Sequence, residues 1–223
     1  MPPYVAERIA IEIVSAIACF ILVRFMAKPF QLTGETRHLG LPLGFGFLGA
    51  SYALSALTFF PLSYDFSNIK WMQLFIRALA FLFLAVTYYF SKSAKGPKLL
   101  WNATFAVLAT VFTMSILVSI INPEYLLPIY QQVSVYVRIF NLLCLSYISI
   151  HALKSHIEQP DPTTLTIPFG YILLGIGQYS LLIWAVDSSI FAFFAGLALR
   201  LAGIAIFLFV AYRTFYSSEE KGE

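Results

Sequence analysis

Seven long apolar stretches, separated by short polar segments, form the main pattern of this chain. They lie near residues 5–27, 39–60, 69–90, 99–121, 129–152, 165–186 and 189–214. A helix that crosses a bilayer needs about 20 mostly apolar residues, and each stretch has that length. The segments between them, such as "KPFQLTGETRH", "SKSAKGPK" and "EQPDPTT", are short. The pattern therefore predicts an all-α membrane protein with seven transmembrane helices in a single transmembrane domain, residues 1–223.

Composition supports lipid as the solvent of this chain. Of its 223 residues, 60% are hydrophobic and only 11% are charged, whereas a soluble domain has roughly 25% charged residues. These charges are too few to cover a surface that faces water. The first apolar stretch has neither a basic leader nor a small-residue cleavage site, so we expect it to be a retained helix and not a signal peptide.

The distribution of lysine and arginine predicts how the helices are oriented. Arg8 and Lys70 flank the spans on one side. Nine basic residues lie on the other side: Arg24, Lys28, Arg37, Lys92, Lys95, Lys98, Lys154, Arg213 and Lys221. Because short basic loops stay in the cytoplasm, we expect the N-terminus outside, the C-terminus inside and a multi-pass location in the cell membrane.

An internal repeat is the second pattern. The phrase "PLGFGFLG" begins at Pro42, and "PFGYILLG" begins at Pro168. Further along, Arg77 aligns with Arg200 when the third and seventh spans are compared. We interpret this as two copies of a three-helix unit, about 4–92 and about 129–216, joined by a linking helix at about 99–121. A parallel repeat of this kind is one of the known designs of transporters.

This 3+1+3 plan resembles that of the SWEET and PQ-loop proteins, and also the seven-helix plan of microbial rhodopsins. More loosely, the chain resembles small archaeal and bacterial seven-helix membrane proteins. It contains no Pro-Gln dipeptide, which is the PQ-loop signature, and no lysine in the seventh span to form a retinal Schiff base. The resemblance to SWEET proteins implies a transporter of a small solute that uses two three-helix halves.

Four ionisable side chains inside the spans are the candidate functional residues: Glu12, Arg77, Arg138 and Arg200. Charged groups within a bilayer are costly, and they mark a functional site by default. All four fall in odd-numbered spans and share a layer in the outer half of the membrane. A Glu12–Arg138 pair would neutralise one arginine and leave two cations without an acidic partner.

Neutral polar residues can join this layer, namely Asn141, Gln178, Tyr136 and Tyr179. Three interpretations stay open. The layer is a structural polar network, or it binds a small anion or an anionic lipid headgroup, or its charges reach the membrane surface or a partner subunit.

The repeated phrase has its own local interpretation. Its prolines and glycines are Pro42, Gly44, Gly49, Pro168, Gly170 and Gly175. Small residues let membrane helices approach closely, so we expect the second and sixth spans to pack tightly at the centre of the bundle. Prolines near helix starts also allow a second interpretation, in which they are the hinges of a gate.

Other residue types predict no chemistry. Cys19 and Cys144 are single cysteines, expected as buried free thiols, and the three histidines lie near the cytoplasmic face without a metal-binding spacing. We therefore expect no metal, no cofactor, no nucleic-acid partner and no enzymatic activity. The sequence favours a subunit or receptor-like module that binds a membrane protein partner, a second copy, a lipid or a small anion within the bilayer. The alternative is a SWEET-like transporter.

Overall fold

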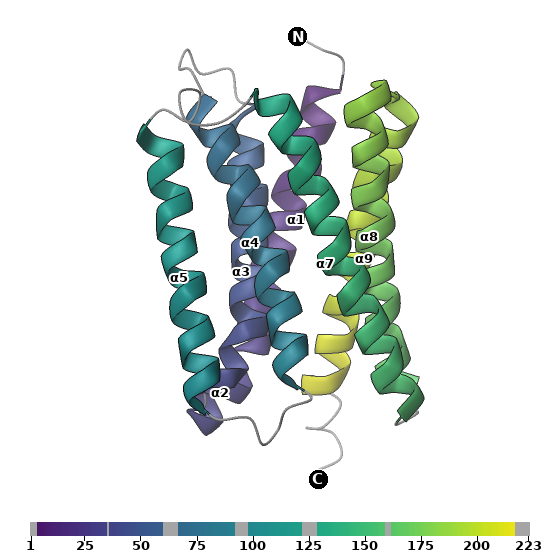
Figure 1. Cartoon of the computed structure of the whole chain (residues 1–223). Helices are drawn as coiled ribbons and strands as arrows, with labels where there is room; N and C mark the ends of the chain where they lie inside the picture. Colours follow the sequence, from purple (N-terminus) through teal and green to yellow (C-terminus); the bar gives the residue numbers. More distant parts are fainter. Residues whose placement is uncertain are drawn as a thin grey trace.

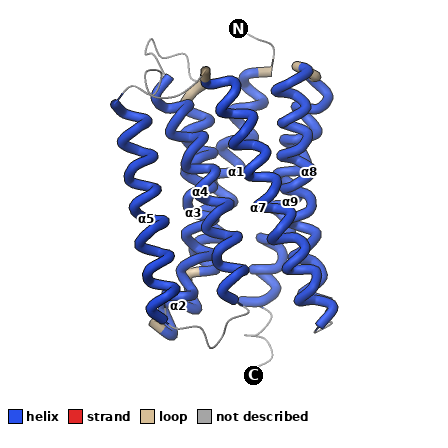
Figure 2. The backbone as a smooth tube through the Cα atoms, viewed as in Figure 1, coloured by secondary structure: helices blue, strands red, loops and turns tan. Residues whose placement is uncertain are grey.

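The computed structural model describes residues 4–34, 36–59, 67–91, 98–121, 129–158 and 162–216, and these residues are almost entirely helical, without a strand (Figures 1 and 2). The long helices are α1 (Val5–Met26), α3 (Gly40–Leu57), α4 (Ser67–Ser91), α5 (Lys98–Ile121), α7 (Tyr130–Glu158), α8 (Pro162–Asp187) and α9 (Ile190–Tyr216). Seven helices are long and apolar enough to cross a membrane. The predicted multi-pass helical protein is confirmed at this level.

The helices differ from the predicted spans in the first connection and at several helix ends. The first connection contains a short helix, α2 (Lys28–Thr33), and a 3₁₀ turn, η1 (Thr36–Leu39), which hydropathy did not predict. Gly34 ends α2 in the left-handed conformation, with φ of 66°, as glycine commonly does. Helix α7 continues to Glu158, past the predicted end of its apolar stretch. Most of "SKSAKGPK", part of "EQPDPTT", and the basic residues Lys92, Lys95 and Lys221 lie outside the described residues.

Six of the long helices form a closed ring. The main contacts join α1 to α3, α3 to α4, α4 to α7, α7 to α8, α8 to α9 and α9 back to α1. Helix α5 packs chiefly against α4 and stands at the edge of the bundle in Figure 1. The start of α1 and the end of α9 lie at opposite ends of the bundle.

Apolar side chains from all six helices fill the middle of this ring. Its fully buried members include Cys19, Leu22, Phe45, Leu48, Phe81, Leu84, Leu145, Ile148, Leu174 and Ile204. Large apolar side chains such as Phe20 on α1 and Met114 on α5 are exposed on the outside. A surface of this kind suits lipid, because hydrocarbon solvates it as well as the protein interior does.

The glycines of the repeated phrase lie at contacts between helices of the same set of three. One set is α1, α3 and α4, and the other is α7, α8 and α9. A Cβ on Gly44 would meet Leu84 of α4, and one on Gly49 would meet Cys19 of α1. A Cβ on Gly170 would lie 2.7 Å from the ring of Phe207 on α9. The expected packing of the second span on the sixth is therefore wrong, because the main partners of α3 are α1 and α4, while those of α8 are α7 and α9.

The prolines occupy different positions in their helices. Pro42 is buried in the first turn of α3. Pro168 is buried. It lies in the interior of α8, because that helix begins at Pro162, before the predicted start of the span. A proline inside a helix removes one backbone hydrogen bond. The hinge interpretation stays a prediction.

The closest approach between helices joins α8 to α9. A Cβ on Gly177 would lie 3.0 Å from the backbone oxygen of Gly196 and 3.3 Å from the backbone nitrogen of Arg200. Gly175 lies on the same helix in a looser environment. A Cβ on Gly175 would have one neighbouring atom within 4 Å, the Cβ of Leu145 at 3.9 Å. The contact at Gly177 thus sets the distance between two backbones, while that at Gly175 does not.

We expect Gly177→Ala to force α8 and α9 apart and to lower the free energy of unfolding by about 1–3 kcal/mol. Gly175→Ala is the matched control on the same helix, and it should stabilise the helix by up to about 1 kcal/mol, because alanine loses less backbone entropy than glycine. Equilibrium unfolding in mixed detergent measures both variants. Equal effects would contradict the assignment of Gly177 to a tight backbone contact.

Candidate functional site

The predicted ionisable residues gather in one half of the bundle, nearer to the end where α1 begins. We call Arg8, Glu12, Arg77, Arg138 and Arg200 the charged layer. Glu12, Arg77 and Arg200 are buried, and Arg8 and Arg138 are half-buried. In a low-dielectric interior such groups need charged or hydrogen-bonding partners, so the partners of each one decide what the layer does.

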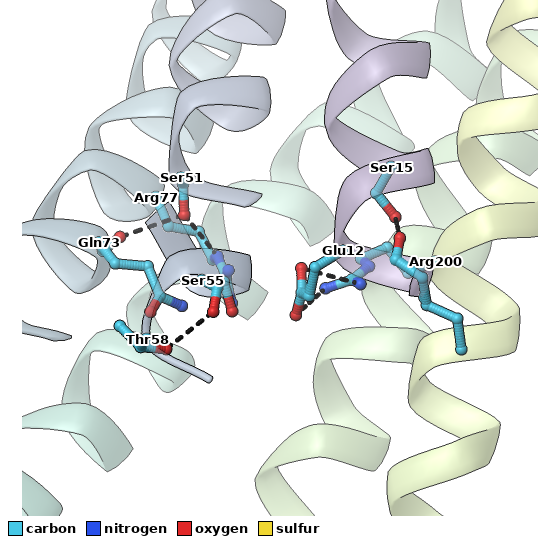
Figure 3. A network of polar contacts seen from close by, with 9 residues as sticks. Glu12, Ser15, Ser51, Ser55, Thr58, Gln73, Arg77 and Arg200 are labelled. Carbon is cyan, nitrogen blue, oxygen red and sulfur yellow. Dashed lines mark hydrogen bonds and ion pairs between the residues drawn. The ribbon is translucent and has the colours of Figure 1, made fainter. Parts of the chain in front are cut away.

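Glu12 forms a two-point ion pair with Arg200 (Figure 3). Nη1 of Arg200 donates to Oε1 of Glu12 at 3.2 Å, and Nη2 lies 3.1 Å from Oε2. Both side chains are almost fully buried. The sequence suggested Arg138 as the partner of Glu12. The ring explains the difference, because α1 packs beside α9, whereas α7 follows α4.

Arg77 is held by a neutral group. Its Nε donates to the hydroxyl of Ser51 at 3.0 Å, and that hydroxyl donates to the backbone oxygen of Gln73 at 3.2 Å (Figure 3). Ser51 belongs to α3, so this contact orients the guanidinium across the α3–α4 interface. It supplies no negative charge. Nη2 of Arg77 is buried without a hydrogen-bond partner.

Tyr52 lies between the two arginines and was missed by the sequence analysis. Its ring is fully buried. The guanidinium carbon of Arg200 is 4.4 Å from the ring centre, and that of Arg77 is 5.1 Å away. Each cation–π contact contributes about 0.5–2 kcal/mol. The polar positions in "SYALS" were the available signal, since Ser51 and Tyr52 stand in an otherwise apolar helix.

Arg8 sits in an aromatic cage. Its guanidinium carbon lies 3.9 Å from the centre of the Phe59 ring, 5.1 Å from that of Phe193 and 5.4 Å from that of Trp184. From the sequence, Arg8 was expected at the outer edge of the membrane. In the structure it lies within α1, one turn before Glu12, and it therefore adds a fourth cation to the layer.

Arg138 has the fewest partners. Its Nε and Nη1 are buried without hydrogen bonds, and the cation that repels it most is Arg77 on the neighbouring helix α4. Oδ1 of Asn141 on the same helix α7 and Oε1 of Gln178 on α8 are also buried without partners. The predicted residues Arg138, Asn141 and Gln178 thus contribute unsatisfied polar atoms. Tyr136 and Tyr179 are exposed and do not face the layer's interior.

The layer holds four cations and one carboxylate among the described residues. Buried polar groups nearly always have partners, so this surplus is the unusual feature of the molecule. In the described part of the chain no group of three histidine, cysteine, aspartate or glutamate side chains is placed to hold a metal ion. Cys19 and Cys144 are buried free thiols.

Comparisons with models of protein families, with curated proteins and with solved structures find no match to this chain.

We expect Glu12→Gln to lower the free energy of unfolding by about 3–5 kcal/mol, because it leaves the buried guanidinium of Arg200 without a counter-charge. Glu7→Gln is the control, since Glu7 is exposed on the same helix, and its effect should be within about 0.5 kcal/mol. Adding Arg200→Gln to Glu12→Gln should restore much of the loss. Equal unfolding free energies for the Glu12 and Glu7 variants would contradict the ion pair.

Proposed function

We propose that this protein is a non-enzymatic membrane module, receptor-like or part of a complex, that binds a small anionic ligand in its charged layer. One observation carries the proposal: Arg77 and Arg138 lie on neighbouring helices, and neither forms an ion pair with a carboxylate among the described residues, since Glu12 is paired with Arg200. Three of their guanidinium nitrogens, Nη2 of Arg77 and Nε and Nη1 of Arg138, lack hydrogen-bond partners. A bound anion would neutralise the repulsion between them and accept these hydrogen bonds.

The other two arginines of the charged layer already have partners, which supports the choice of Arg77 and Arg138 as the ligand-binding residues. Arg200 has Glu12 as its counter-ion, and Arg8 is covered by three aromatic rings. The remaining two guanidiniums stay protonated at any physiological pH. Arginine is the side chain best suited to an oxygen anion, because it presents parallel N–H donors to two oxygens at once.

The position of the layer implies the side from which the ligand enters. With the N-terminus outside, as the distribution of basic residues favours, the charged layer is in the outer half of the membrane. We propose that the ligand arrives from outside the cell and that the protein lies in the cell membrane. The half-buried state of Arg138 is consistent with entry between α4 and α7.

A small-solute transporter is the second candidate, and the ring of helices favours it. The contacts within α1, α3 and α4 resemble in order those within α7, α8 and α9, while α5 stays outside. This arrangement is what a 3+1+3 parallel repeat would give. The filled middle of the ring, with Leu22, Phe45 and Leu145 fully buried, favours binding over passage of a solute.

We expect inorganic phosphate to raise the melting temperature of the purified protein above its value in chloride at equal ionic strength. Arg77→Gln and Arg138→Gln should each remove most of this shift, because each deletes donors and half of the positive charge that attracts the anion. Arg24→Gln, exposed near the other end of α1, should leave it unchanged.

Without added anion, Arg138→Gln should not lower the melting temperature, because it removes a buried charge that lacks a counter-ion. A loss of stability would instead indicate a structural network. Repeating the series in vesicles with and without phosphatidic acid distinguishes a lipid headgroup from a free anion. A shift that survives in both glutamine variants would exclude this pair of arginines as the site.

A further inference from the structure

A cavity of about 140 Å³, partly open to the outside, lies at the end of the bundle opposite the charged layer. It is bounded by residues near the ends of α1, α4 and α9 and near the starts of α3 and α8. Six of its lining residues are Met26, Leu41, Tyr88, Tyr171, Phe207 and Ala211. The wall thus contains residues of α1, α3 and α4 as well as of α8 and α9, and most of its surface is apolar.

Few polar atoms line this wall. The rings of Tyr88 and Tyr171 pack edge to face, with their centres 5.4 Å apart. The hydroxyl of Thr214 donates to the backbone oxygen of Val210 at 2.8 Å. A buried water needs two to four polar partners, whereas the lining is mainly apolar and the hydroxyl of Thr214 is bonded to the backbone. The cavity therefore suits an apolar occupant better than water or a polar ligand.

Aromatic packing fixes the shape of the cavity. The Phe207 ring lies against Gly170, where a Cβ would approach it to 2.7 Å. Its centre is 4.6 Å from that of Tyr171 and 5.3 Å from that of Phe45. Rings held on several sides do not swing readily into the empty space, because interiors are close-packed. The space stays open instead of collapsing.

We propose that this cavity binds a hydrocarbon group of about the volume of benzene. An apolar cavity of about 150 Å³ in another protein stays dry and takes benzene or xenon, which matches the volume and the lining found at this site. Small aromatic molecules and the ends of lipid chains share the required chemistry. This site is separate from the charged layer in position and in ligand class.

The methionines give a direct test. In protein labelled with ¹³C at its methionine methyl groups, benzene should shift the Met26 resonance, because an aromatic ring in the cavity lies beside that methyl group. Met114 is the internal control, since it is exposed on α5 and reports benzene dissolved in the surrounding detergent. The Met26 shift should saturate with benzene concentration, and the Met114 shift should rise linearly.

Two substitutions on α9 make the test specific. Ala211→Leu fills the cavity and should abolish the saturable shift. Ala205→Leu is the same change at an exposed position of α9 and should preserve it. If Ala211→Leu fails to fold, Val210→Phe serves instead, because Val210 lines the cavity and is only half-buried.

Absence of a saturable Met26 shift in the unaltered protein, or its persistence in the cavity-filling variant, would overturn the proposal. So would an equal affinity for benzene and for a polar molecule of similar size such as pyrazine. In lipid nanodiscs, a nuclear Overhauser effect between acyl-chain methyl groups and Met26 would identify the lipid as the source of the hydrocarbon. The same effect from added benzene, without one from lipid, would identify a free small molecule.

Discussion

A buried carboxylate in the ion pair of Glu12 with Arg200 constrains the rest of the bundle. Each charge is costly inside a membrane unless its partner lies within hydrogen-bonding distance, so α1 and α9 must be neighbours with these residues at one level. That contact closes the ring of six helices. Tyr52 extends it, because its ring contacts Arg200 and Arg77 and so links α3 and α4 to the same level. The charged layer thereby fixes the relative heights of four helices, which apolar packing against lipid alone does not specify.

The seven helices were predictable because hydropathy measures the cost of placing a segment in water, and each span carries that signal over its full length. The neighbours of each helix were not predictable, because apolar surfaces are interchangeable in hydropathy. Gly44, Gly49 and Gly170 were identified as packing residues, but the sequence did not show which helix each one faces. Only the structure places Gly170 against Phe207 and Gly177 against Gly196. Helix α2 was missed because it lies in a polar connection.

The residues of the charged layer were visible from sequence, because a charge inside an apolar span is rare. Their pairing was not, since it depends on how the ring closes. Glu12 reaches Arg200 and not Arg138 because α9, and not α7, lies beside α1. Neutral partners carry a weaker signal. Tyr52 and the aromatic cage of Arg8 consist of residues that are common in any membrane helix, and only their convergence in space makes them part of the layer.

Helix α5 packs chiefly against one other helix, yet its presence determines the direction in which the helices after it cross the bundle. A single crossing, α5, separates α4 from α7, so α7 begins at the same end of the bundle as α1 and α4. Removing one crossing would invert the last three helices and carry Arg200 to the opposite level from Glu12. A helix that contributes little packing energy thus determines that two triplets of helices point the same way. Selection on α5 would then act on its length and its ability to cross, while its lipid-facing side chains are free to drift.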